Sequence, residues 1–275
     1  MIAVGRPEQF HPFGKFDLEK GYAYIDRIGY RLPSTMAEII GERLQNELEE
    51  GASNGTTCKK QSKRKNSAIQ RSLTPHLDCC PQTYNNPSNK SKWRPIQCFV
   101  SLTDNLEANT GGFEAAPGFH RNFHAWTRER SPSTITKRNT KSGAKYKVQV
   151  DAPCVGEYTH IRPKEDAHVM KAVKHIPVRA GSAVFWDNRI PHANAYKNEG
   201  TSARAVIYCS FLPDVEINRD YVEKQLEDYR LGRIPRDQWI NISSGENDSN
   251  VGSEEYCEEY KFSHFGEKLM NITPW

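Results

Sequence analysis

Short apolar segments separated by glycine and proline turns most constrain the fold of this chain. Residues 96–102, 182–186 and 205–211 are rich in β-branched, aromatic and other apolar side chains, and a proline or glycine stands close to each of them. Runs of this length and composition, bounded by turn residues, are typical of strands. Shorter strands are predicted at 21–25, 111–118 and 175–178. Together they predict a mainly β fold, a jelly-roll barrel with flanking helices packed outside it.

Two helices are predicted beside these strands. From Ser34 onward, apolar residues recur three or four positions apart, as on one face of a helix, and Gly51 would end it. Thr35 and Glu38 can form a capping box at its start. A second helical stripe is predicted over 221–229. The apolar residues of the first stripe are Met36, Ile39, Ile40, Leu44 and Leu48.

The chain is long enough for one large domain, which we expect to span 1–240 with a core at about 21–213. Within it, a basic insertion at about 121–174 is predicted to be largely irregular. The segment 51–66, after the first helix, is predicted to be a loop. Residues 241–275 are expected to form an acidic, partly flexible C-terminal tail.

Composition and cysteine usage predict a cytoplasmic protein. Hydrophobic residues make up 36% of the chain and charged residues 26%, and no run approaches the roughly 18 apolar residues of a membrane span. The N-terminus lacks the apolar core of a signal peptide. Seven cysteines, an odd number without a Cys-x-x-Cys pair, argue against a disulfide framework and for a reducing compartment. We expect Cys79 and Cys80 to be thiols beside a candidate metal site.

The formal net charge of +4 is unevenly distributed. Lys59–Lys65 and Arg121–Lys147 are basic, whereas Ser243–Glu259 is acidic. Solvated loops and a flexible tail explain these stretches. The alternative is that the basic loops attract a partner that carries phosphate or carboxylate groups.

Two histidines and one aspartate could form this metal site. His76 and Asp78 are two positions apart, so on a strand they face the same side, and His192 ends a later predicted strand. Two imidazoles and one carboxylate suit divalent iron and leave coordination positions open. The alternative for the first pair is a surface histidine beside an aspartate that caps a turn.

Arg204 follows His192 by twelve positions and opens the apolar run 205–211. An arginine offers a planar fork that binds a carboxylate through two hydrogen bonds, so it could hold the far carboxylate of a 2-oxo acid that chelates the metal. The alternative is a surface arginine paired with an acidic residue. Its apolar neighbours favour the interior.

Four blocks of this sequence resemble the phytanoyl-CoA dioxygenase-like family of Fe(II)- and 2-oxoglutarate-dependent oxygenases. They are Arg94–Asp104, Gly111–His120, Ala180–His192 and Asn198–Arg204, within a resemblance that runs from about Gly21 to Pro213. The resemblance implies a double-stranded β-helix (jelly-roll or cupin-like barrel) with Fe(II), 2-oxoglutarate and O2. It places iron on His76, Asp78 and His192, the 2-oxoglutarate C5 carboxylate on Arg204, and further co-substrate contacts on Trp93, Asn194 and Gln97. For Gln97, a hydrogen-bonding role at a sheet edge is an equal alternative.

The resemblance implies hydroxylation of a C–H bond of a small molecule, which the basic loops suggest is anionic, with release of succinate and CO2. The substrate itself does not carry over, because the segments 51–75 and 121–174 differ from the family. A macromolecular substrate, either a protein side chain or nucleic acid, is the alternative. Nucleic acid is disfavoured, because such demethylases carry a second arginine six residues after the first and Ser210 stands there. A non-catalytic binding module is the remaining alternative.

Overall fold

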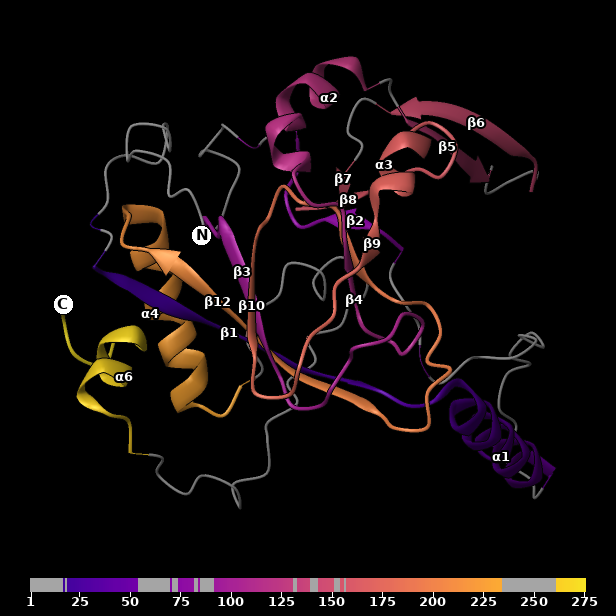
Figure 1. Cartoon of the computed structure of the whole chain (residues 1–275), viewed down its shortest axis with the longest axis horizontal. Helices are drawn as coiled ribbons and strands as arrows, with labels where there is room; N and C mark the ends of the chain where they lie inside the picture. The colour runs from indigo at the N-terminus through magenta and orange to yellow at the C-terminus, as the bar shows by residue number, and fades with distance from the viewer. Residues whose placement is uncertain are drawn as a thin grey trace.

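The computed structural model describes residues 17, 19–53, 70, 74–81, 84, 92–130, 133–138, 143–150, 154–155, 157–233 and 261–275 (Figure 1). Most of the regular structure is β, and helices lie around the sheets. The strands are β1 (Gly21–Arg31), β2 (His76–Leu77), β3 (Ile96–Ser101), β4 (Phe113–Ala115), β5 (Ser133–Arg138), β6 (Lys145–Val150), β7 (Cys154–Val155), β8 (Tyr158–His160), β9 (Lys174–His175), β10 (Ala183–Asp187), β11 (His192–Asn194) and β12 (Arg204–Pro213). The helices are α1 (Ser34–Ser53), α2 (Phe123–Glu129), α3 (Ala167–Ala172), α4 (Glu216–Arg230) and α6 (His264–Leu269), with a 3-10 turn at Phe119–Arg121.

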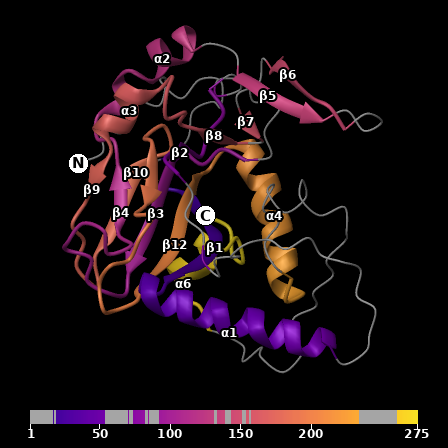
Figure 2. The same cartoon turned by 90° about the vertical axis from the view of Figure 1, so that its right-hand side faces the viewer.

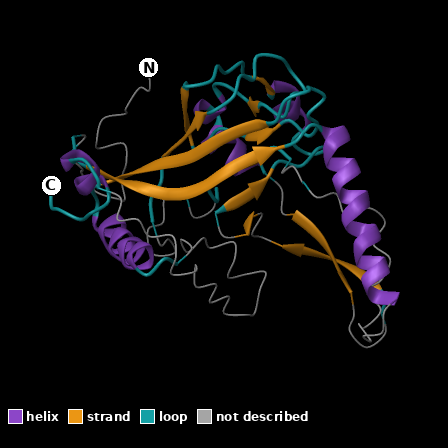
Figure 3. Ribbon diagram, turned by 90° about the horizontal axis from the view of Figure 1, so that it is seen from below, coloured by secondary structure: helices purple, strands orange, loops and turns teal. Residues whose placement is uncertain are grey.

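One sheet has four strands in the order β1-β12-β3-β10, and all its pairs are antiparallel. Its two longest strands, β1 and β12, pair from Gly21 opposite Pro213 to Arg31 opposite Arg204. They run across the middle of the molecule (Figure 3). Because partners in register lie on the same face of a sheet, Arg31 and Arg204 share a face.

The second sheet has six strands in the order β7-β8-β2-β11-β4-β9, again antiparallel. At its centre, His192 of β11 pairs with His76 of β2 on one side and with Ala115 of β4 on the other. The centre of this sheet therefore brings together two histidines that are far apart in the sequence.

Aromatic contacts join the two sheets in a common core. Phe99 of β3 contacts Phe113 of β4 with ring centroids 5.4 Å apart, and Phe113 contacts Trp186 of β10 at 4.9 Å. Along β12 the burial alternates, with Val206 buried and Ile207 exposed, as expected when one face covers a core. The structure confirms a mainly β fold with antiparallel sheets and flanking helices.

The insertion is more regular than predicted. It contains α2, α3, the hairpin β5–β6 and the short strands β7 and β8, where we expected largely irregular chain. Long-range packing explains the difference, because Phe123 and Trp126 of α2 and Val169 of α3 form a buried cluster with Leu77 of β2. These elements lie together at one end of the molecule (Figure 1).

The second predicted helix is confirmed as α4, which begins earlier than the stripe indicated. It packs on the β1–β12 end of the first sheet, where Tyr22, Leu212 and Val222 form a buried cluster. In the segment where we expected a tail, the described residues 261–275 include α6, and Trp275 Nε1 donates a hydrogen bond to the Gly21 carbonyl at 2.8 Å. Residues 241–260 lie outside the described part.

The first predicted helix is confirmed as α1, which continues past Gly51 to Ser53. It extends away from the sheets (Figures 1 and 2). The apolar side chains on one face of α1 are not packed into a core, because Met36, Ile39 and Leu44 remain exposed. The basic segment 59–65 lies outside the described residues.

The prediction that Cys79 and Cys80 are both thiols is wrong for one of them. Cys79 is a buried thiol, but Cys80 forms a disulfide with Cys154, with Cα atoms 5.6 Å apart. The pairing of β2 with β8 and of β8 with β7 brings the two cysteines together. The cysteine count alone therefore misjudged this pair and gives no support for a reducing compartment. No helix in the described ranges is long and apolar enough to cross a membrane.

Candidate metal centre

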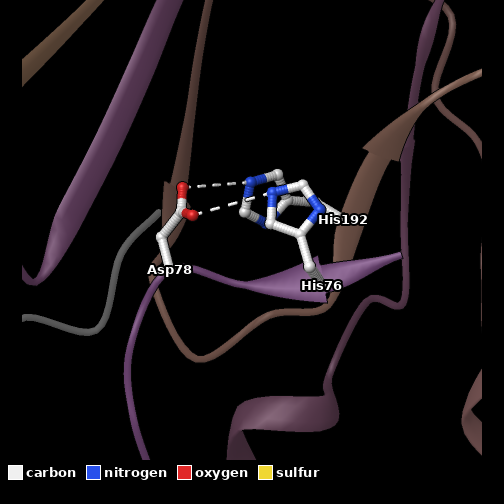
Figure 4. Close-up of side chains that lie close together, drawn as sticks. All are labelled: His76, Asp78 and His192. Atoms are coloured by element: carbon white, nitrogen blue, oxygen red, sulfur yellow. Dashed lines mark ion pairs between the residues drawn. The ribbon is translucent and has the colours of Figure 1, made fainter. Parts of the chain in front are cut away.

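His76, Asp78 and His192 meet at the centre of the six-stranded sheet (Figure 4). The two histidines are paired across β2 and β11, and Asp78 follows β2 directly. One ligand atom from each residue lies within 4.8 Å of the others. Asp78 Oδ1 is 3.6 Å from His76 Nε2, and Asp78 Oδ2 is 3.5 Å from His192 Nε2. The structure thus brings together all three predicted metal ligands.

Both imidazoles are oriented by a backbone carbonyl two residues earlier. His76 Nδ1 donates to the Thr74 carbonyl at 2.9 Å, and His192 Nδ1 donates to the Ile190 carbonyl at 3.0 Å. Since a carbonyl oxygen can only accept, each Nδ1 carries a proton, and in the neutral imidazole Nε2 is then the nitrogen that can bind a metal. This outer contact is typical of histidines that bind metals, because it fixes the tautomer and the ring orientation.

Asp78 is held as a carboxylate. Gln97 Nε2 donates to Asp78 Oδ2 at 2.5 Å, and Arg94 Nη2 lies 3.8 Å from the same oxygen. Burial raises the pKa of Asp78, but its hydrogen-bond contact with His192 and electrostatic interactions with its neighbours, among them the guanidinium of Arg94, outweigh burial and hold this pKa well below its usual value. Burial, followed by repulsion from His192, lowers the pKa of His76 to about 4. A negative oxygen therefore faces a neutral His76, as a metal ligand set requires.

Aromatic side chains enclose the triad. The His76 ring stacks on Tyr158 at 4.9 Å, and the His192 ring lies 5.1 Å from Trp186 and 6.0 Å from Phe113. Gln97 Oε1 and Trp186 Nε1 are buried and have no hydrogen-bond partner among the residues that the structure describes. Buried polar atoms normally have partners, so their lack of one indicates that polar ligand atoms or water belong beside the triad.

Arg204 lies in the same interior, at the start of β12. It is only 2% exposed, yet within the described part of the chain its Nε and Nη2 have no hydrogen-bond partner and no carboxylate pairs with it. Its Nη1 donates to the Tyr208 hydroxyl at 3.4 Å, and its guanidinium lies over the Phe99 ring. Tyr208 in turn hydrogen-bonds Asn194, which is two residues beyond His192 on β11. A buried guanidinium that lacks a counter-charge is costly, so this position suits an anionic ligand.

The other predicted residues differ in their surroundings. Asn194 joins the arginine end of the site through Tyr208, and Gln97 contacts the predicted metal ligand Asp78. Trp93 is buried beside α4, where Asn218 binds its backbone N–H at 2.7 Å and its carbonyl at 3.0 Å. Its contact with a co-substrate stays a prediction.

Sequence reasoning missed Tyr208 and Arg94 as site residues. Tyr208 lies four positions after Arg204 on one strand, so the alternation of β12 could have placed both on the inner face. Arg94 had no such signal. Arg94 lies next to Ser210, with Arg94 Nη1 3.5 Å from the Ser210 hydroxyl oxygen. Its guanidinium is the positive charge beside Asp78.

The sequence profile of the Gig2-like family matches residues 71–263, which is more than half of the chain. This chain belongs to the Gig2-like family. The matched range contains the triad and Arg204, and it begins after β1 and α1. This match does not itself show the phytanoyl-CoA dioxygenase-like family, which stays a resemblance of the four sequence blocks. A search of curated proteins found no match to this Gig2-like chain.

Solved structures of similar fold are also longer proteins. Hypothetical protein JW0805 from Escherichia coli is 16% identical to this chain, with a TM-score of 0.59, and the superposition covers 94% of this chain and 61% of JW0805. GlcNAc Inducible Gene 2, GIG2, from Candida albicans is 16% identical with a TM-score of 0.55, covering 93% and 55%. A candidate oxidoreductase from Salmonella typhimurium LT2 is 15% identical with a TM-score of 0.56, covering 95% and 60%. The likeness shows a shared fold, and this chain spans only 55–61% of these proteins' length.

Proposed function

We propose that this chain is an Fe(II)- and 2-oxoglutarate-dependent dioxygenase that hydroxylates a C–H bond of a small molecule. In this proposal, His76, Asp78 and His192 hold the iron and Arg204 holds the distal carboxylate of 2-oxoglutarate. The observation that carries the proposal is the buried guanidinium of Arg204, which pairs with no carboxylate of the described residues. It lies in the same interior as the triad, in which the Nε2 atoms of both histidines face the carboxylate of Asp78.

The donor set fits iron better than the common alternatives. Two imidazole nitrogens and one carboxylate oxygen favour divalent iron with open coordination positions, whereas structural zinc sites take four nitrogen or sulfur ligands. Cys79, the nearest thiol in sequence, is engaged elsewhere, because its Sγ donates to the Asn188 carbonyl at 3.4 Å. Iron bound here would supply oxidising chemistry, using 2-oxoglutarate and O2 to insert oxygen into a C–H bond with release of succinate and CO2.

The side chains of the chain have separate tasks in this proposal. Gln97 and Arg94 keep Asp78 ionised and oriented toward both histidines. Arg204 binds the distal carboxylate through its free nitrogens, and Tyr208 links that arginine to Asn194. The aromatic layer of Phe99, Phe113 and Trp186 contacts His192 at one end and Arg204 at the other, and these apolar surroundings strengthen both sets of polar contacts.

The burial of the site favours a small-molecule substrate. His76 and His192 are both buried, and only Asp78 keeps a partly exposed edge. A substrate must therefore enter the interior between the sheets, which a compact molecule does more readily than a folded macromolecule. We further propose that the two antiparallel sheets are the halves of a double-stranded β-helix, the arrangement that the resemblance of the four sequence blocks implies.

Anaerobic reconstitution tests the proposal. The wild-type protein should retain one Fe(II), develop the visible absorption of a chelated 2-oxo acid when 2-oxoglutarate is added, and form succinate when O2 and candidate substrates are supplied. His76→Ala should lose the iron, and with it the absorption on addition of 2-oxoglutarate and the formation of succinate. His264→Ala, which removes a histidine whose side chain is 79% exposed, is the matched control and should behave as wild type. A wild-type protein that retains no more iron than His76→Ala would refute the proposal.

A further inference from the structure

Arg204 has a second arginine beside it. Arg31 ends β1 directly opposite Arg204 in the β1–β12 register, so both side chains lie on the inner face of the sheet. Both are buried, at 8% and 2% exposure. Two guanidinium groups on the same buried face repel each other unless an anion lies near them.

The chain makes room for Arg31 on this face. Gly111 has a φ of +75°, and a Cβ built on it would lie 2.8 Å from Arg31 Cδ, so a larger residue there would displace the arginine stem. Arg31 Nη2 donates to the carbonyl of Tyr196, two residues beyond Asn194. The guanidinium thus reaches the end of β11 that already carries Asn194, next to the Arg204–Tyr208 pair.

Electrostatics agrees with this proximity. Burial, followed by the charge of Arg204, lowers the pKa of Arg31 from its ordinary value. The two arginines therefore disfavour each other's charge, which a bound carboxylate would relieve for both. Arg27 on the same strand differs, because its side chain is 65% exposed and pairs with Asp26.

We propose that Arg31 is a second cation of the co-substrate site, which acts with Arg204 on the distal carboxylate and restricts the co-substrate to dicarboxylic 2-oxo acids. This inference rests on the proposed function and adds a specificity-determining residue to it. A 2-oxo acid that lacks the distal carboxylate has the same chelating end but nothing for the two arginines to bind. Arg31 should therefore distinguish the two kinds of acid.

The test compares 2-oxoglutarate with 2-oxobutanoate on anaerobic, Fe(II)-loaded full-length protein. Arg31→Gln removes the charge but keeps a donor for the Tyr196 carbonyl, and Arg31→Lys keeps the charge. Since a hydrogen bond to a charged group contributes about 1.5–3 kcal/mol, Arg31→Gln should raise the Kd of 2-oxoglutarate roughly 10- to 100-fold and leave the Kd of 2-oxobutanoate unchanged. Arg31→Lys should recover part of the loss, and the control Arg27→Gln should match wild type.

The outcomes separate this inference from the proposed function. A wild-type protein that binds neither acid would refute the proposed function itself. If wild type binds 2-oxoglutarate while Arg31→Gln weakens both acids equally or neither, Arg31 has no role in selecting the dicarboxylate and the inference is wrong. Failure of both Arg31 variants to fold, judged by thermal melting, would make Arg31 a structural residue and would overturn the inference as well.

Discussion

Two buried arginine sites of this protein differ in where their counter-charge comes from. Where α2 ends and α3 begins, Arg130 and Arg162 share the carboxylate of Asp166, with nitrogen–oxygen distances of 3.4 and 3.3 Å. Between the sheets, Arg204 has no such carboxylate among the described residues. Two guanidinium nitrogens of Arg130 also lack a hydrogen-bond partner among the described residues, so the decisive difference between the two sites is the carboxylate itself.

This difference teaches how a structural arginine can be distinguished from a binding arginine. We call the first site complete because its counter-charge lies within the fold, where Asp166 also accepts hydrogen bonds from Trp126 Nε1 and from the backbone N–H of Arg162. We call the second site incomplete, because in the proposed function its counter-charge is the carboxylate of a bound 2-oxo acid. Because a buried charge without a partner costs free energy, the two sites should respond in opposite ways when a charge is removed.

The largest effect is expected at the complete site. Asp166→Ala leaves two arginines without their carboxylate and should lower the free energy of unfolding by about 3–5 kcal/mol. Chemical denaturation measures the loss. The control Glu199→Ala removes an exposed ion pair with Lys197 and should change stability by less than about 1 kcal/mol. If both substitutions lower the free energy of unfolding by the same amount, the buried ion pairs of Asp166 contribute no more than the exposed pair of Glu199, and the prediction is wrong.

At the incomplete site, the missing anion should stabilise the protein when it binds. With Fe(II) present and O2 absent, 2-oxoglutarate at about 100 times its Kd should raise the free energy of unfolding by about 2.7 kcal/mol. In Arg204→Met the same concentration should give almost no stabilisation. Thermal melting with and without the acid measures both. Full stabilisation of the variant would show that the acid binds without Arg204.

Removal of the unpaired charge should itself stabilise the ligand-free protein. Arg204→Met replaces a buried guanidinium by an apolar side chain over Phe99, and should raise the free energy of unfolding by about 1–3 kcal/mol. The exposed Arg179→Met is the matched control, with little expected change. If Arg204→Met is strongly destabilised instead, the guanidinium is already paired within the fold and the comparison fails.

The smallest effect is expected in the pH dependence of the complete site. Burial raises the pKa of Asp166. The backbone hydrogen bond from Arg162, the charge of Arg130 and the hydrogen bond from Trp126 lower it by more, so the pKa in the folded protein is below its ordinary value. The stabilisation is present above the unfolded pKa of about 3.9 and is lost as the pH falls through the folded value. Unfolding curves from pH 5 to 2 should show a flatter decline for Asp166→Asn than for wild type. Parallel declines would exclude this carboxyl as a source of acid sensitivity.

Local sequence patterns predicted the residues of the candidate site better than the structure of the insertion around it. His192 with Asn194 and Arg204 with Tyr208 share a face because each pair is an even number of positions apart on one strand, and Asp78 directly follows the strand of His76, so each pair could be inferred from its spacing. The strands β1, β3, β10 and β12 carried clear apolar signals for the same reason. The insertion did not, because α2 and α3 are stabilised by long-range packing on Leu77 rather than by their own periodicity.

Only the tertiary structure decided which of these faces meet. The pairing of β11 with β2 joins His192 to His76, and the pairing of β1 with β12 sets Arg31 beside Arg204. The same kind of pairing brings Cys154 to Cys80, which composition alone could not show. The physical reason is that a residue's face follows from local backbone geometry, whereas the partner of a strand follows from the packing of the whole core. The sequence by itself therefore determined which residues could form a metal centre, and the fold decided that they do meet.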